Sequence, residues 1–256
     1  MKKYIYLLAM TIICFSCGTF DFIEGNGPIV EEELDIDLFT KISNNCSLDV
    51  YITEGPDQKV IAKGHQNIID RVRTSVISGE WEVDLQEGSY RDFKCEIHIE
   101  MPNLEAVKVD GSGDFDIKNI TVKELHLKID GSGDINMEEG LTTTNKLKVE
   151  IDGSGEIYVS DLEATDVEVD IDGSGDITLR GICDHNKVVV FGSGDFRGFA
   201  LEAKTCEVKV DASGTSEVDV IEDLEVVIEA SGDVYYKGNP SVNQRINGSG
   251  RLINAN

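Results

Sequence analysis

Acidic side chains stand on both sides of a short glycine phrase that recurs along the second half of the chain. Before the phrase the chain carries Asp110, Asp130, Asp152, Asp172 and Asp211. After the phrase it carries Asp114, Asp134, Glu156, Asp176, Asp195 and Asp233. Calcium prefers oxygen ligands, so rows of carboxylates could hold Ca²⁺ between neighbouring segments. The candidate calcium ligands are Asp130, Asp134, Asp152 and Asp172.

A second interpretation gives these carboxylates a structural role. If the repeated segments stack as strands, the carboxylates of one column lie roughly 5 Å apart. Like charges at that spacing destabilise one another unless they are paired, screened or bridged. Each carboxylate could accept hydrogen bonds from N–H groups of its own glycine turn, as in Asx turns. The phrase differs from the Gly-Gly-x-Gly-x-Asp pattern of calcium-binding repeats, so we favour self-capping and expect no cofactor.

The residue types that usually carry catalysis form no recognisable set. The histidines are scattered over unrelated segments, at His65, His98, His126 and His185. No nucleophile can be matched with a base, and acidic pairs are too common to mark a glycosidase pair. The glycine phrase lacks Rossmann and P-loop spacing. We therefore expect no catalytic residues and no enzyme activity. The alternative is a polysaccharide-active enzyme, because some β-helical folds cleave polysaccharides.

The cysteines divide into two groups. Cys14 and Cys17 lie at the end of an apolar run near the N-terminus. The other four lack zinc-finger spacing and are Cys46, Cys95, Cys183 and Cys206. In an exported chain they could form two disulfides, with three possible pairings. The predicted pairs are Cys46–Cys95 and Cys183–Cys206.

Residues 1–17 are predicted to be a targeting segment that is not part of the fold. Lys2 and Lys3 precede an apolar run over residues 4–15, which is too short to span a membrane. Ser16 directly before Cys17 resembles the processing site of bacterial lipoproteins, so Cys17 is the predicted lipidation site. An ordinary secretory signal cut nearby is the alternative. Both interpretations predict an exported protein.

The remaining chain divides into a short acidic segment and one long domain. Residues 18–37 are predicted to be a tether, and residues 38–256 a β-helical head domain. The formal net charge of the whole chain is −26. A surface this acidic repels nucleic acid and anionic lipid headgroups, and the sequence has no basic patch. We expect no nucleic-acid partner.

The glycine phrase itself is Gly-Ser-Gly-Asp or a near copy, and it indicates the architecture. Its copies begin at Gly111, Gly131, Gly153, Gly173, Gly192, Ala212, Ala230 and Gly248. Steps of 18 to 22 residues are typical of a solenoid, in which each repeat forms one coil. We predict an all-β fold: a single right-handed parallel β-helix with coils of about 20 residues.

Apolar residues recur at fixed distances from the phrase. Two residues before its first position stand Val109, Ile129, Ile151, Ile171, Val190, Val210, Ile228 and Ile246. Four residues after that position stand Phe115, Ile135, Ile157, Ile177, Phe196 and Val234. Stacked coils would turn these columns into inward ladders of largely β-branched side chains. An antiparallel β-sandwich with hairpins at the glycines is the alternative, but it does not require whole repeats to align.

The glycines of the phrase have a local structural role. Glycine suits the corner between two strands because it tolerates positive φ and close backbone approach. The second glycine is present in every copy of the phrase, so we predict that only glycine is tolerated there.

Residues 34–100 alternate apolar and polar side chains, which indicates strands with one buried face. Residues 66–72 could hold a helical turn.

The stretch from Phe39 to Asp116 carries a family resemblance. It contains Leu48-Asp49-Val50-Tyr51-Ile52, then Ile97-His98-Ile99-Glu100-Met101-Pro102-Asn103-Leu104, and ends in the first glycine phrase. Over residues 38–254 the pattern resembles the bacterial family of "putative auto-transporter adhesins" with a head GIN domain. The resemblance implies an exported β-helical protein, often lipid-anchored, with no established catalytic or ligand site.

The sequence and the resemblance together lead to one expectation of function. We expect a non-enzymatic outer-membrane lipoprotein, on the periplasmic or surface face, that works as a binding and adhesion module. Its expected partners are the membrane through its lipid and an unidentified glycan or protein. A second copy could bind at the solenoid ends, because a last coil exposes unpaired strand edges. The alternatives are a polysaccharide-active enzyme and a structural envelope protein.

Overall fold

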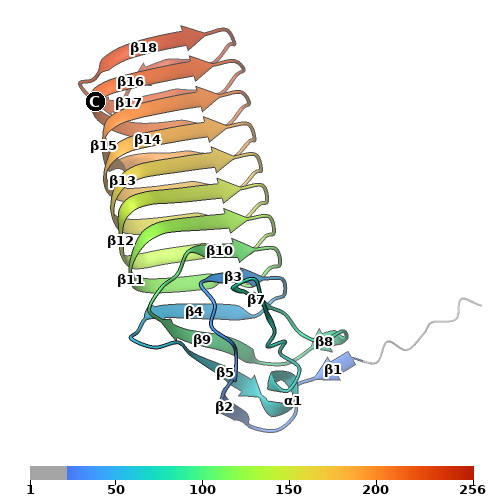
Figure 1. The fold of residues 1–256 in the computed structure, drawn as a ribbon. Helices are drawn as coiled ribbons and strands as arrows, with labels where there is room; N and C mark the ends of the chain where they lie inside the picture. Colours follow the sequence, from blue (N-terminus) through green and yellow to red (C-terminus); the bar gives the residue numbers. More distant parts are fainter. Residues whose placement is uncertain (1–21) are drawn as a thin grey trace, which may run out of the picture.

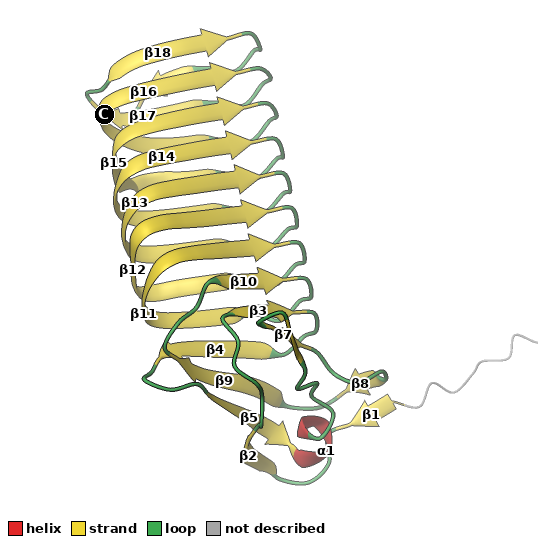
Figure 2. Cartoon of the chain, in the orientation of Figure 1, coloured by secondary structure: helices red, strands yellow, loops and turns green. Residues whose placement is uncertain are grey.

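The chain folds into a β-solenoid whose coils are stacked along one axis (Figure 1). The computed structural model describes residues 22–256, apart from the side chains of residues 142–144. Strands make up nearly all of the regular structure, and one short helix lies at the N-terminal end (Figure 2). The predicted all-β solenoid is confirmed, and the antiparallel sandwich is wrong, because successive repeats pair in parallel.

The elements fall into a base and a regular stack. The base comprises β1 (Phe22–Glu24), β2 (Ile29–Glu33), β3 (Lys41–Asn44), β4 (Asp49–Glu54), β5 (Lys59–His65), α1 (Gln66–Ile69), β6 (Val76–Ile77), β7 (Glu80–Val83), β8 (Ser89–Arg91) and β9 (Cys95–Met101). The stack comprises β10 (Ala106–Val109), β11 (Phe115–Ile129), β12 (Ile135–Ile151), β13 (Ile157–Ile171), β14 (Ile177–Val190), β15 (Phe196–Val210), β16 (Ser216–Ile228), β17 (Val234–Gly238), β18 (Ser241–Ile246) and β19 (Leu252–Asn254).

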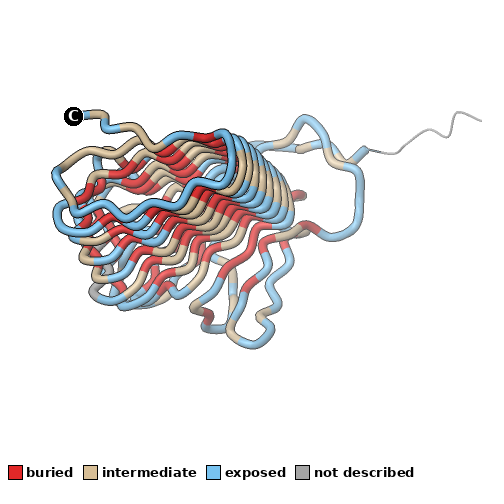
Figure 3. The backbone as a smooth tube through the Cα atoms, turned by 90° about the horizontal axis from the view of Figure 1, so that it is seen from above, coloured by how far each residue is buried: buried red, intermediate tan, exposed pale blue. Residues whose placement is uncertain are grey.

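Each long strand bends around the coil and takes part in two sheets. The first residues of β11 pair with β4, and its last residues pair with β10. We call one of these two sheets the post-turn sheet; it contains β9, β4, the first parts of β11–β16, β17 and β19, and from β11 onward its segments follow a glycine turn. The pre-turn sheet contains β7, β3, β10, the last parts of β11–β16, and β18. A view along the solenoid shows buried residues lining the space between the two sheets (Figure 3).

The core follows from the apolar columns of the sequence. In β13, Ile157, Val159, Val167, Val169 and Ile171 are all at most 2 % exposed. They alternate with half-buried or exposed residues, as expected for strands with one face inward. In-register parallel pairing then places each inward residue on its equivalent in the next coil. The predicted ladders are confirmed.

The base does not follow the order of the chain. Strands β3 and β4 lie between two pairs of strands that come later in the chain. β7 and β9 pair with them on one side, and β10 and β11 pair with them on the other. Below β9 the sheet continues antiparallel through β5 and then β2. The helix α1 follows β5 and buries Ile68 and Ile69, which confirms the helical turn.

The segment expected to be a tether contains two paired strands. Within residues 18–37, β1 pairs with β8 and β2 pairs with β5, so the part from Phe22 to Glu33 contributes strands to the fold. The physical reason is that Ile23 and Val30 pack against the core despite their acidic neighbours. Residues 1–17, with the candidate lipidation site Cys17, lie outside the described residues. No helix within residues 22–256 is long and apolar enough to cross a membrane.

Glycine is required at the turns because of close approach between coils. A Cβ added at Gly175 would lie 2.0 Å from the carbonyl oxygen of Gly155 in the preceding coil. The first glycine of the same phrase, Gly173, has a similar distance of 2.1 Å to the carbonyl oxygen of Gly153. Neither glycine has positive φ. Of the two reasons considered for glycine, the close backbone approach applies here.

Candidate binding surface

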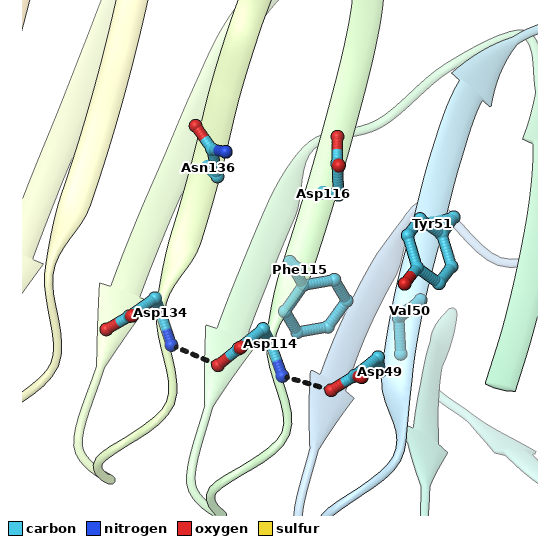
Figure 4. Close-up of a pocket in the computed structure, with 8 residues that line it drawn as sticks. All are labelled: Asp49, Val50, Tyr51, Asp114, Phe115, Asp116, Asp134 and Asn136. Atoms are coloured by element: carbon cyan, nitrogen blue, oxygen red, sulfur yellow. Dashed lines mark hydrogen bonds between the residues drawn. The ribbon is translucent and has the colours of Figure 1, made fainter. Parts of the chain in front are cut away.

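The carboxylates that follow the glycine turns tie each coil to the next. Oδ1 of Asp114 accepts a hydrogen bond from the backbone N–H of Asp134 at 2.8 Å (Figure 4). Oδ1 of Asp134 accepts one from the backbone N–H of Glu156 at 2.7 Å. The same contact joins Asp176 to the N–H of Asp195. The expectation that each carboxylate caps its own turn is therefore corrected. In-register stacking places the equivalent N–H of the next coil within reach of the carboxylate.

The ladder of caps is interrupted where the residue type changes. Glu156 and Thr215 occupy the aspartate position. Among the residues that the structure describes, neither of these side chains accepts a backbone N–H from the next coil. At the start of the ladder Asp49 accepts the N–H of Asp114 at 3.3 Å. Aspartate therefore has the side-chain length that this inter-coil cap requires.

The aspartates before the turns are bridged by lysine. Nζ of Lys108 lies 2.7 Å from Asp110 and 2.8 Å from Asp130 in the next coil. Nζ of Lys128 repeats the arrangement, at 3.0 Å from Asp130 and 2.9 Å from Asp152. Burial would raise the pKa of Asp130, but its hydrogen bonds to the two lysines outweigh burial and lower it to about 2. These bridges were not predicted from the sequence, although a lysine two residues before the aspartate marks both of them.

The lysine bridges end where acidic residues replace lysine. Glu150 and Asp170 occupy the column of Lys108 and Lys128. Burial raises the pKa of Asp170, and the charge of Glu150 adds to that rise. The side chain of Glu150 is itself held by Lys148 and His126.

The four candidate calcium ligands do not converge on one position. Asp130 and Asp152 share Lys128, whereas Asp134 lies on the other side of the turn and caps Glu156. Asp172 follows Asp152 one coil further along the stack. Within residues 22–256, no group of three or more His, Cys, Asp or Glu side chains is arranged to hold a metal ion.

The four cysteines of the fold are free thiols in the structure, so the predicted disulfides are not formed there. In each predicted pair one thiol nevertheless affects the pKa of the other. Burial raises the pKa of Cys95 to about 12, and the nearby Cys46 adds to the rise. Burial likewise raises the pKa of Cys206, with a further contribution from Cys183. The pairing of these cysteines stays a prediction.

The histidines form no cluster among the described residues, although His65 and His98 lie on the paired strands β5 and β9. His98 lies on β9 in the base, where its ring stacks on Tyr51 with 4.8 Å between centroids. Nε2 of His126 contacts Glu150, and Nδ1 of His185 contacts the hydroxyl of Thr205 at 2.8 Å. The ring of His65 accepts the N–H of Lys94. Each histidine therefore has a local partner of a different kind.

The outer face of the post-turn sheet combines rings with cations. The guanidinium carbon of Arg180 lies 5.6 Å from the ring centroid of Tyr158. Nζ of Lys237 lies 4.3 Å from the ring centroid of Phe199. In the part of the chain that the structure describes, neither cation has an ion-pair partner within 4.0 Å. This outer face therefore offers aromatic and cationic groups on a strongly acidic protein.

Towards the base, the same face is hollowed beside Tyr51. A shallow cavity of about 230 Å³ is lined by Asp49, Val50, Tyr51, Asp114, Phe115, Asp116, Asp134 and Asn136 (Figure 4). Tyr51, Asp116 and Asn136 occupy equivalent positions in successive coils. Burial and then the charge of Asp49 raise the pKa of the Tyr51 hydroxyl, which stays protonated and able to donate a hydrogen bond. We call this outer face, from Tyr51 to Lys237, the aromatic face.

Comparison with known proteins gives one family and several similar structures. A family model described as "Putative auto-transporter adhesin, head GIN domain" matches residues 38–145 and 139–240. No curated protein matches the chain.

Solved structures share the whole fold. A "putative adhesin" from Parabacteroides distasonis is 26 % identical with a TM-score of 0.83, and a "putative lipid binding protein" from the same organism is 25 % identical with a TM-score of 0.82. A "putative adhesin" from Parabacteroides merdae is 20 % identical with a TM-score of 0.84 and shows likeness of fold. Each comparison covers 92 % of this chain and 100 % of the other.

Proposed function

Because the chain belongs to the family described as "Putative auto-transporter adhesin, head GIN domain", we propose that it is a non-enzymatic binding and adhesion module of the bacterial cell envelope. The observation that carries the proposal is the aromatic face, where rings and cations lie on one continuous sheet. Tyr51 stacks on His98, Tyr158 lies under Arg180, and Phe199 lies under Lys237.

The chemistry of this face favours a glycan as the ligand. Sugar rings carry apolar C–H faces that pack on aromatic rings, and hydroxyls that bond to amide and hydroxyl groups. Asn136 and Thr178 supply such polar groups between the aromatic residues. Positions one coil apart lie about 4.8 Å from one another, so an extended chain would meet a new side chain at each coil.

Glycan-array binding of the protein, followed by titration with the best ligand, tests this proposal. Replacing Tyr51, Tyr158 and Phe199 with alanine should weaken binding by about tenfold or more. The matched control is Phe191→Ala, because Phe191 is an exposed ring that lies in a turn. Unchanged binding after the triple replacement would overturn the site. Shortened glycan products after incubation would instead favour the enzyme alternative.

We further propose that Cys17 is lipidated and that the protein is an outer-membrane lipoprotein. Since Phe22 belongs to β1, at most about 18 Å of extended chain separates its α-carbon from that of Cys17. The base of the solenoid would therefore be held near the bilayer, and the C-terminal coils would project away from it. Cys17→Ala should release the protein from the membrane fraction, whereas Cys14→Ala should not. Retention of Cys17→Ala with unchanged mass would contradict the anchor.

A further inference from the structure

β18 is an edge strand among the described residues. β18 pairs with β16 on one side, and no other described strand pairs with it. Val242, Gln244 and Ile246 continue the inward columns of Leu224, Val226 and Ile228. All six residues of β18 are exposed, and Val242 and Ile246 are each 39 % exposed. The end of the core and a row of backbone hydrogen-bonding groups therefore face solvent at this end.

The same coil lacks the acidic charge of the rest of the protein. The whole chain has 49 acidic residues, but residues 241–256 contain none. Their two cations are neutralised by the coil below: Arg245 contacts Glu229 at 3.0 Å, and Arg251 contacts Asp233 at 2.6 Å. Copies of this chain repel one another through most of their surface, but residues 241–256 add no acidic side chain to that repulsion.

The opposite end of the solenoid provides a contrast. β2 is also an edge strand, because β5 is its one described neighbour. It carries Glu31, Glu32 and Glu33 in succession. Charged residues on an edge strand oppose pairing with another chain. One edge is therefore protected by charge, whereas β18 is not.

We propose that β18 is a self-association edge, at which two copies pair end to end through antiparallel β18 strands. A two-fold arrangement uses the same surface on both copies and closes without forming a filament. With Gln244 on the two-fold axis, Val242 lies opposite the partner's Ile246. This register keeps the inward residues of both copies on one side of the joined sheet. The outward pair is Arg245 with the partner's Asn243, so no like charges meet.

Disulfide trapping in the full chain tests the register. In Gln244→Cys the two introduced thiols would lie about 4.5–5.5 Å apart between α-carbons, which permits a disulfide. The control is Ser241→Cys, because its two copies would be separated by about 20 Å along the paired strands. We expect a covalent dimer on non-reducing gels for Gln244→Cys and a monomer for Ser241→Cys. Equal trapping of both variants, or of neither, would overturn the proposal.

Solution size provides an independent measurement. The purified full chain in detergent micelles should show a monomer–dimer equilibrium by sedimentation. Val242→Lys should raise the dissociation constant by about tenfold or more, because it places a charge opposite an apolar residue. Thermal unfolding should show that this variant is folded, since Val242 is at the open end. Filaments in place of dimers would overturn the two-fold arrangement, and a monomer at all concentrations would overturn the edge itself. Glycan binding is measured separately, so neither outcome decides the proposed ligand face.

Discussion

Gly175 shows how closely successive coils approach. Its added Cβ would lie 2.0 Å from one carbonyl oxygen and 3.0 Å from Cγ2 of Ile151, so both backbone and core would have to move. Gly175→Ala should therefore lower the free energy of unfolding by about 1–3 kcal/mol, as overpacking does. Chemical denaturation checks this, with Ser174→Ala as the control because Ser174 is exposed in the same turn. Equal stabilities of the two variants would contradict the proposed contact.

Asp130 makes stability depend on pH. Its pKa is lowered to about 2 in the folded protein, below the ordinary value of 3.8. A depressed folded-state pKa stabilises the protein above the unfolded pKa, and this contribution is lost as pH falls through the folded one. Asp130→Asn should therefore lower the melting temperature at pH 7, and the difference from wild type should shrink from about pH 4 down to pH 2. A difference that is independent of pH would contradict the lysine bridges.

Residue roles were predictable only in part from the sequence. The inward position of Ile157 and the need for glycine at Gly175 follow from the spacing of the repeats. The target of Asp134 does not, because the sequence fixes neither the direction in which the side chain turns nor the coil that it reaches. The buried Asn44 was also missed: its Nδ2 donates to the carbonyl of Leu48 at 2.7 Å in a turn without the glycine phrase.

At the scale of elements, the turns are joined by caps that cross between coils. Asp134→Ala removes the acceptor for the N–H of Glu156, which should cost about 1 kcal/mol. Hydrogen exchange of the Glu156 amide should become faster in Asp134→Ala. In Asp134→Asn an amide oxygen remains as an acceptor, so exchange should stay closer to that of the wild type. Equal exchange rates in all three proteins would mean that the cap does not protect this amide.

The acidic columns of the strands should respond weakly to calcium. Asp130 and Asp152 already share Lys128, so a cation would have to compete with this ammonium group. We expect millimolar Ca²⁺ to raise the melting temperature no more than Mg²⁺ does, because both ions screen charge in the same way. A calcium-specific rise of several degrees that Asp152→Asn with Asp172→Asn abolishes would show a true site.

The regular stack was more predictable than the base. From Gly111 onward, the repeats specify parallel pairing because every coil meets a copy of itself. In the base, β2, β5 and β9 are joined antiparallel, and β3–β4 is inserted between later strands. Those pairings join segments without a shared pattern, so alternation alone predicts the strands but not their neighbours.

At the scale of the whole molecule, the base closes one end of the core. Trp81 is fully buried there, contacts Phe39 at 5.5 Å between centroids, and donates its indole N–H to the carbonyl of Arg73 at 2.9 Å. Trp81→Ala should lower the free energy of unfolding by about 3–5 kcal/mol. Phe191→Ala is the control, because that ring is 43 % exposed and should contribute little. If both variants lost a similar amount of unfolding free energy, Trp81 in the base would contribute no more to stability than an exposed ring does.

The inserted position of β3–β4 has a consequence for how the protein is made. A chain that leaves the export channel N-terminus first presents residues 41–54 early, but both neighbours of this unit come later, from β7 to β11. The first coil therefore has no strand partner until β7 has emerged, about thirty residues later, and has partners on both sides only when β10 and the start of β11 have emerged, about sixty residues later. After that point each new repeat can join a finished template as it appears. For an exported chain, this order of strands predicts one slow initiation step followed by vectorial growth, and the need for chaperones should be greatest before the first glycine phrase has emerged.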